Sequence, residues 1–267
     1  ALAYMEIPVK RKMFAAFALG SALAVGAAHT QPTNSENVTI YAAAVVKTSL
    51  TAIAAEYEEM TGNTTTVVFD SAGASQQNFL SDPEAVLLIT TPARIENSER
   101  EGALQAGTSI ALGTTVAGVA VPPESEKPDI SSSEKLKAAL LAAERIVFSN
   151  PARGATVGTH FMTVIESLGI RDEVLAKATL ARNGVETMHL VLEEGVDIGI
   201  TQTSEILQAN RDALAGPFPE EFELATDYSL WHRSDISPAV EDFIAMLISP
   251  AGREKLVEEG LMSPTEP

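Results

Sequence analysis

The segment that decides the fold is residues 38–89, VTIYAAAVVKTSLTAIAAEYEEMTGNTTTVVFDSAGASQQNFLSDPEAVLLI. Its β-branched or apolar runs at 38–44, 64–69 and 85–89 are typical of strands. The segments between them, 47–60 and 72–80, predict helices; in the first, Leu50, Ile53 and Tyr57 share one face. Strand, helix, strand, helix, strand in this order predicts a parallel sheet with right-handed crossovers.

A second α/β series follows an extended stretch at 113–123 and a polar linker at 124–133. Apolar patterning predicts helices at 134–143, 156–168 and 185–194, with strands at 145–149, 178–181 and 196–200. We interpret 210–220 as a loop, 223–231 as a strand that returns to the first unit, and 238–247 and 252–259 as terminal helices. The sequence therefore predicts an α/β protein with two lobes and a cleft between them. Lobe 1 comprises 38–118 and 226–267, and lobe 2 comprises 119–225.

The N-terminal residues predict an export signal. Lys10, Arg11 and Lys12 precede an apolar run, 13–28, that carries no charge and ends in small residues. We expect residues 1–28 to be a signal peptide cleaved near Ala28, and 29–37 to be a disordered linker. The run is short for a membrane span, although an N-terminal anchor helix remains the alternative. The expected location is the periplasm, as a soluble protein.

Composition excludes several functions. The 267 residues have a formal net charge of −18, which disfavours nucleic acid and anionic membranes as partners. The absence of cysteine excludes thiolate metal sites and cysteine nucleophiles, and the four histidines are too scattered for a metal site. No set of nucleophile, base and orienting group stands out. We therefore expect a monomeric binding protein without catalytic residues, metal or cofactor.

The strand-to-helix turns are the candidate binding sites, because they present unpaired amide N–H groups and the positive ends of helices. Arg153, beside Gly154 at a turn, predicts a bidentate pair with a carboxylate ligand; a surface ion pair is the alternative. Ser71 and Gln202 predict hydrogen bonds into the cleft, or else helix caps. The complete set of predicted ligand-binding residues is Ala44, Val45, Ser71, Ala72, Gly73, Arg153, Gly154, Thr156 and Gln202. This interpretation requires free amides and a cleft that is not lined by carboxylates.

Three segments resemble the periplasmic molybdate-binding proteins. The opening VTIYAAAVVKTSLTAIAAEYEEMTG with SAGAS and AVLLI is similar to their first lobe. RIVFSNPARGATVGTHFMTVIESLGI and VLEEGVDIGITQTSEIL are similar to their second lobe. The resemblance covers most of residues 38–263. It implies a type II periplasmic binding fold and an ABC permease of the inner membrane as partner.

The chain departs from that family at the anion site. Val45 stands where the resemblance implies a serine, and Ala72 stands where a second is expected, with Ser71 one position earlier. Each missing hydroxyl donor weakens oxyanion binding by about 1.5–3 kcal/mol. The predicted function is therefore capture of a small anion, either a molybdate- or tungstate-like oxyanion or a small organic carboxylate, for an ABC importer. The alternatives are a sensory binding protein that presents a carboxylate to a receptor, and a hydrolase that uses a serine in the cleft.

Overall fold

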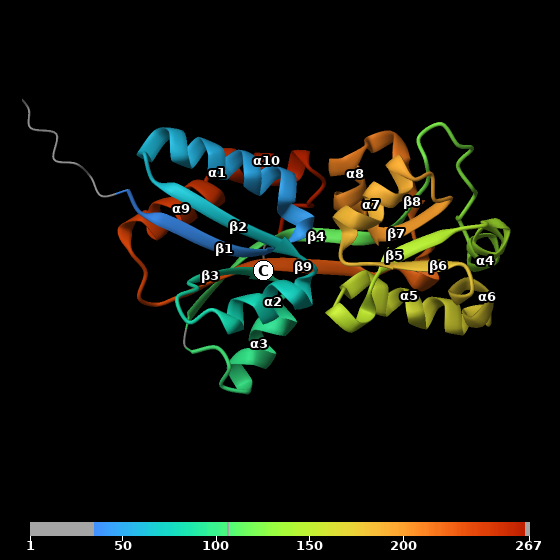
Figure 1. The fold of residues 1–267 in the computed structure, drawn as a ribbon, viewed down its shortest axis with the longest axis horizontal. Coiled ribbons are helices and arrows are strands. Elements are labelled where there is room, and N and C mark those ends of the chain that lie inside the picture. Colours follow the sequence, from blue (N-terminus) through green and yellow to red (C-terminus); the bar gives the residue numbers. More distant parts are fainter. Residues whose placement is uncertain (1–34, 106, 265–267) are drawn as a thin grey trace, which may run out of the picture. The chain divides into compact units, whose positions relative to one another are not determined.

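The computed structural model describes residues 35–105 and 107–264. The predicted signal peptide, 1–28, and residues 29–34 of the predicted linker lie outside the described residues. From Ser35 onward the chain forms one compact unit, in which helices cover both faces of a sheet that runs through two lobes (Figure 1). The predicted two-lobed α/β fold is confirmed.

The first lobe is built on a sheet with the strand order β2-β1-β3-β9-β4. Strands β1 (Asn37–Ala43), β2 (Thr64–Asp70) and β3 (Leu87–Thr90) are parallel, and β9 (Ala225–Arg233) runs antiparallel to β3. Figure 1 shows α1 (Lys47–Thr61), α9 (Pro238–Ile248) and α10 (Pro250–Glu258) on one face. The other face carries α2 (Ala72–Ser81) and α3 (Pro92–Arg100). Both faces of this sheet are therefore buried, as the apolar strand sequences require.

The second lobe repeats this arrangement around three parallel strands. In it β7 (Ile198–Gln202) and β6 (Ala178–Ala181) flank β5 (Ile146–Ser149). Helices α7 (Gly184–Glu193) and α8 (Thr203–Ala209) cover one face, and α4 (Ser133–Ala142), α5 (Thr156–Ser167) and α6 (Arg171–Leu175) cover the other (Figure 1). The core residues on the α4–α5 side include Phe148, Phe161 and Ile200.

Two long strands connect the lobes. Strand β4 (Gly107–Ala120) pairs with β9 through Val116 and with β7 from Ala117 onward. Strand β9 begins at Ala225, beside Val116. On this basis we propose that the lobes divide near 118/119 and 225/226, so that the two crossings act as the hinge.

Most predicted elements are present within two residues of their expected ends, but the structure adds several. Helices α3, α6 and α8 had not been identified, and β4 begins six residues before the predicted extended stretch. The predicted loop at 210–220 contains a short strand, β8 (Leu214–Pro217), which pairs with β4. The glycine and proline of β8 made it resemble a loop, and its pairing comes from a distant strand. None of the helices in the described ranges has the length and apolarity needed to cross a bilayer.

Candidate functional site

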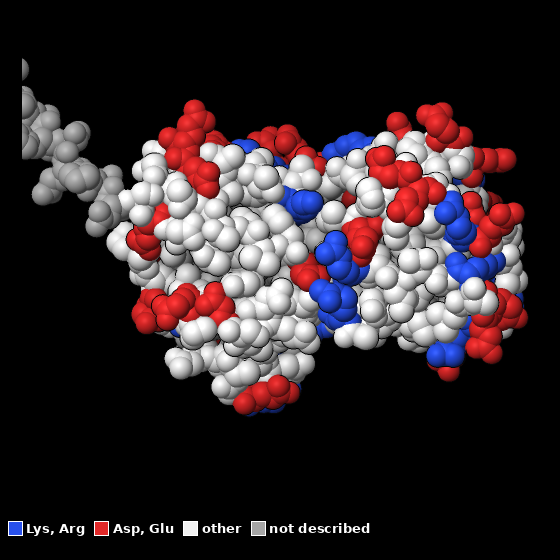
Figure 2. Space-filling view, viewed as in Figure 1, with Lys and Arg blue, Asp and Glu red and all other residues white. Residues whose placement is uncertain are grey.

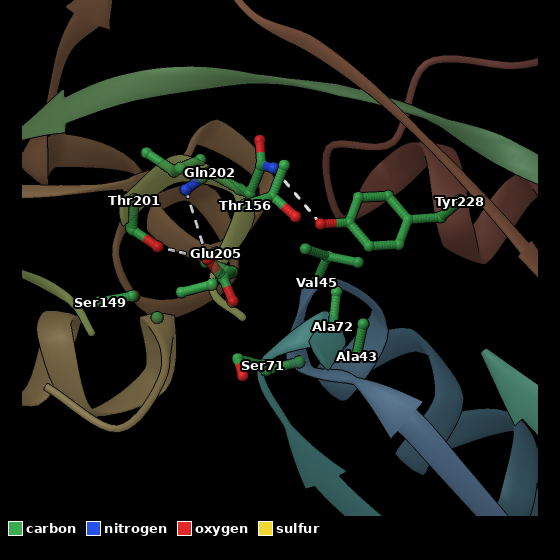
Figure 3. Close-up of a pocket in the computed structure, with 14 residues that line it drawn as sticks. Ala43, Val45, Ser71, Ala72, Ser149, Thr156, Thr201, Gln202, Glu205 and Tyr228 are labelled. Atoms are coloured by element: carbon green, nitrogen blue, oxygen red, sulfur yellow. Dashed lines mark hydrogen bonds between the residues drawn. The ribbon is translucent and has the colours of Figure 1, made fainter. Parts of the chain in front are cut away.

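A small cavity lies where the ends of strands from both lobes meet (Figure 3). It has about 20 Å³ of space for the centres of water-sized molecules. From the first lobe it is lined by Ala43, Ala44, Val45, Ser71, Ala72 and Tyr228. From the second lobe it is lined by Ser149, Ala155, Thr156, Val157, Gly184, Thr201, Gln202 and Glu205.

Six of the nine predicted site residues line this cavity, namely Ala44, Val45, Ser71, Ala72, Thr156 and Gln202. They come together because β1, β2 and β7 end there, as does β5 next to the turn before α5. The Ser71 hydroxyl is not available to bind a ligand in the cavity. It caps α2 by accepting from the Ala74 amide, and it donates to the carbonyl oxygen of Arg153 at 2.8 Å.

Three helices present the N–H groups of their first turn at the cavity. The residues are Ala72 of α2, Thr156 and Val157 of α5, and Gly184 of α7. In the described part of the chain these four amides have no acceptor, as is usual at the start of a helix. The positive ends of the three helix dipoles therefore converge on one small space, which favours negative charge there.

Tyr228 adds a hydroxyl donor to these amides. Gln202 Nε2 donates a hydrogen bond to the Tyr228 oxygen at 3.3 Å, and the Thr156 side chain lies within hydrogen-bonding reach of the same oxygen. Tyr228 also lines the cavity, so its phenolic O–H can be directed at a ligand oxygen there (Figure 3). Burial, followed by the nearby Glu205 carboxyl, raises the pKa of Tyr228 well above its usual value. Tyr228 thus stays protonated and keeps its donor.

The cavity also contains one carboxyl group, contrary to our expectation for an anion site. Glu205 is 9% exposed, and its Oε2 accepts hydrogen bonds from the Thr201 hydroxyl and from the Gln202 amide. The bond from the Gln202 amide is part of the capping box at the start of α8. Burial raises the pKa of Glu205, and these two hydrogen bonds only partly oppose the shift. The raised pKa makes this carboxyl group easier to protonate than an exposed glutamate, and in its protonated form it would not repel an anion.

The remaining three predicted residues, Gly73, Arg153 and Gly154, form a contact between the lobes beside the cavity. Arg153 Nη2 pairs with Asp70 Oδ2 at 2.6 Å, which is the ion pair that the sequence left as the alternative to a ligand contact. The Gly73 amide donates to Gly154 O at 3.2 Å and is therefore not free for a ligand. We call this contact, formed by Asp70, Ser71, Gly73, Arg153 and Gly154, the glycine latch.

Two further side chains hold the lobes together. Arg94 of α3 donates from Nη2 to Gly154 O at 2.9 Å and from Nη1 to Gln76 Oε1 at 3.1 Å. On the opposite side of the cavity, Gln208 of α8 donates to Val45 O and accepts from the Thr48 amide at 2.9 Å. The structure thus has the lobes closed over the cavity, with hydrogen bonds on both sides.

Sequence reasoning missed Tyr228, Glu205, Gly184 and Arg94. Glu205 had a local signal, since it stands three residues after the cap residue Gln202, the spacing of a capping box. Tyr228 and Arg94 had none, because both approach the site only through the packing of lobe 1. Within the described ranges no group of three or more His, Asp or Glu side chains could hold a metal ion.

The charge on the surface contrasts with the lining of the cavity. Figure 2 shows Asp and Glu side chains over both lobes, and Lys and Arg side chains among them where the lobes meet on this face. No lysine or arginine side chain lines the cavity. Its positive potential therefore comes from amide and hydroxyl dipoles, which are fixed in position by the helices.

Residues 38–262 match the family model described as bacterial extracellular solute-binding protein. The chain belongs to this family. A search of curated protein sequences finds no match. Among solved structures, this solute-binding protein is similar to the periplasmic molybdate-binding protein of Azotobacter vinelandii, with a TM-score of 0.66 and 16% identity over 86% of this chain and 100% of that one.

Two other solved structures share the fold at equally low identity. A substrate-binding protein with bound phosphate from Clostridium perfringens, named for a phosphate ABC transporter, has a TM-score of 0.62 and 11% identity over 86% of this chain and 100% of that one. Peb3 from Campylobacter jejuni has a TM-score of 0.59 and 17% identity over 85% of this chain and 100% of that one. These likenesses establish the fold of the solute-binding protein. Its ligand has to be inferred from its own residues.

Proposed function

We propose that this solute-binding protein captures a small tetrahedral oxyanion between its lobes and delivers it to an ABC importer from the periplasm. The observation that carries the proposal is the cavity itself, where unpaired amides from three helix starts and the Tyr228 hydroxyl converge. These donors come from both lobes. A ligand bound there would therefore stabilise the closed state.

The size of the cavity favours an oxyanion over an organic carboxylate. The space open to the centres of water-sized atoms, about 20 Å³, equals a sphere with a radius of roughly 1.7 Å. That radius is close to the bond between the central atom and oxygen in a tetrahedral oxyanion, so four oxygens on one centre fit. A dicarboxylate with a carbon backbone does not fit in this closed state. The pairing of Arg153 with Asp70 also removes the arginine that a carboxylate would have used.

The transport role is supported by the family and by the two-lobed fold. Members of the family are extracellular solute-binding proteins, and similar folds include proteins named for molybdate and phosphate binding. Closure of two lobes about a hinge gives a permease two distinguishable states of the protein. The proposed export signal and periplasmic location fit this role, as does a monomeric protein.

A panel of anions tests the proposal. We expect molybdate, tungstate, sulfate or phosphate to raise the melting temperature of the purified protein, and malate and citrate to leave it unchanged. A ligand at 100 times its Kd stabilises by about 2.7 kcal/mol, which corresponds to roughly 5–10 °C for a protein of this size. Isothermal titration calorimetry should then give a stoichiometry of one. Saturable binding of a carboxylate, with none of the four oxyanions bound, would refute the proposal.

Tyr228→Phe should weaken binding of the oxyanion identified by the panel. Loss of one hydroxyl donor to a charged ligand costs about 1.5–3 kcal/mol, so Kd should rise about 10- to 100-fold. The matched control is Tyr41→Phe, because the Tyr41 hydroxyl bonds to Asp82 in lobe 1 and does not line the cavity. Calorimetry on both variants decides the point; equal Kd values for Tyr228→Phe and the wild type would remove Tyr228 from the binding site.

A further inference from the structure

Glu205 is the one side chain in the cavity whose chemistry opposes an anion. Its carboxyl group packs on the first residue of α7, since a Cβ at Gly184 would overlap both carboxyl oxygens and Cδ. The same side chain lines a larger groove of about 260 Å³ on the other side, between α1 and α7. Glu205 therefore belongs to the lining of both the cavity and the groove.

The surroundings of Glu205 contain no compensating cation in contact with it. None of the ion pairs within the described ranges involves Glu205. Tyr228 faces it from β9 across the cavity, and Lys47 of α1 and His189 and Glu193 of α7 line the groove behind it. A dianion in the cavity would meet an ionised Glu205 as a like charge at short range, in a site with little water.

The hydrogen bonds of Glu205 leave one oxygen available for a proton. The Thr201 hydroxyl and the Gln202 amide both donate to Oε2. Neither donor engages Oε1, so a proton can reside there and form a hydrogen bond with a ligand oxygen. The groove gives this carboxyl group a route for exchanging its proton with solvent while the lobes stay closed.

We propose that this site binds an oxyanion together with one proton, which lies between Glu205 and the ligand. A fully ionised oxyanion, such as sulfate or molybdate, binds when Glu205 is protonated and donates to it. A hydrogen oxyanion, such as hydrogen phosphate, brings its own proton and donates it to the Glu205 carboxylate. This inference rests on the proposed oxyanion function and adds the proton as a determinant of specificity.

The two ligand classes should differ in their pH dependence. Above the pKa of Glu205 in the free protein, binding of a fully ionised oxyanion must take up a proton, so affinity falls about tenfold per pH unit. Below that pKa, Glu205 is already protonated and the affinity is flat. Hydrogen phosphate needs no added proton, so its affinity relative to sulfate rises with pH. Raising the pH thus shifts the preference toward the oxyanion that carries a proton.

Calorimetry from pH 5 to pH 10, in buffers of different ionisation enthalpy, measures the protons taken up on binding. At each pH above the pKa of Glu205 in the free protein, we expect the wild type to take up about one proton per bound sulfate or molybdate and about none per bound phosphate. Glu205→Gln keeps the size of the side chain and cannot ionise, so its proton uptake should be near zero for every oxyanion. Its preference for phosphate over sulfate should also fall at least tenfold.

A matched control and a second variant separate this role from packing. Glu193→Gln removes an exposed carboxyl group from the neighbouring groove and should leave proton uptake unchanged. Gly184→Ala should displace the flexible end of Glu205 and abolish the proton linkage, because the added methyl group occupies the carboxyl position.

The measurement on the wild-type protein tests the proposed role of Glu205 even if a variant does not fold. Sulfate or molybdate binding that stays equally tight from pH 5 to pH 10, with no proton uptake at any pH in that range, would overturn the role of Glu205 and leave the proposed function standing. A purified protein that binds none of the four oxyanions would overturn both.

Discussion

Gly73→Ala should hold the two lobes apart and weaken oxyanion binding by about 100-fold or more. A Cβ at position 73 would lie 2.6 Å from Gly154 Cα and 2.9 Å from Arg153 O, which are backbone atoms of the other lobe. Backbone atoms cannot rotate away as a side-chain end can, so the glycine latch cannot close as before. If closure is disfavoured by about 3 kcal/mol, the apparent Kd rises by about two orders of magnitude.

The melting temperature of the unliganded Gly73→Ala protein should change little. The clash involves two lobes that can separate at the β4 and β9 crossings, and it leaves the core of each lobe intact. Calorimetry gives the affinity, and small-angle X-ray scattering should show a larger radius of gyration than for the wild type. Gln77→Ala, at an exposed position of the same helix, is the control. Wild-type affinity in Gly73→Ala would show that the latch does not govern closure.

Gly158→Ala should instead destabilise the fold itself. A Cβ at position 158 would overlap the carbonyl oxygen of Ser149 at the end of β5. Both residues belong to the second lobe, so opening the hinge cannot relieve the overlap. Helix α5 must move away from β5, and overpacking of this kind costs about 2–3 kcal/mol. The corresponding fall in melting temperature is roughly 5–10 °C for a domain of this size.

Urea unfolding followed by circular dichroism measures this loss of stability. The midpoint should fall with little change in the m-value, because the surface exposed on unfolding is the same. Thr159→Ala, at an exposed position of α5, should stay within about 0.5 kcal/mol of the wild type and is the control. Oxyanion binding should weaken as well in Gly158→Ala, since Thr156 and Val157 begin the same helix. A stability equal to that of Thr159→Ala would show that α5 does not pack on β5 as closely as the structure has it.

The pair of substitutions also separates the two roles that glycine has near the cavity. The same added methyl group meets a neighbouring lobe at position 73 and its own lobe at position 158. We therefore expect a large effect on affinity with little effect on stability in the first, and a large effect on stability in the second. This contrast tests whether the lobes move as separate bodies.

The sequence by itself determined the order of most strands and helices, α3, α6, α8 and β8 excepted, and the turns that meet at the cavity. β-Branched and apolar runs identified β1, β2, β3, β5 and β7, and the apolar face of 47–60 identified α1, because these patterns depend only on residues close in the chain. The same local reasoning placed Ala72 and Thr156 at helix starts with unpaired amides. Six of the nine predicted site residues line the cavity for this reason.

The tertiary structure alone decided which of those turns face a ligand and which face the other lobe. Arg153, Gly154 and Gly73 stand at turns like the others, but they join the latch because the packing of the lobes puts Asp70 and Gly154 within hydrogen-bonding distance of them. Tyr228 and Glu205 enter the cavity from β9 and α8 through contacts between residues far apart in the chain. Local sequence sets the conformation of a turn, whereas the partner of that turn depends on how two separately folded layers meet.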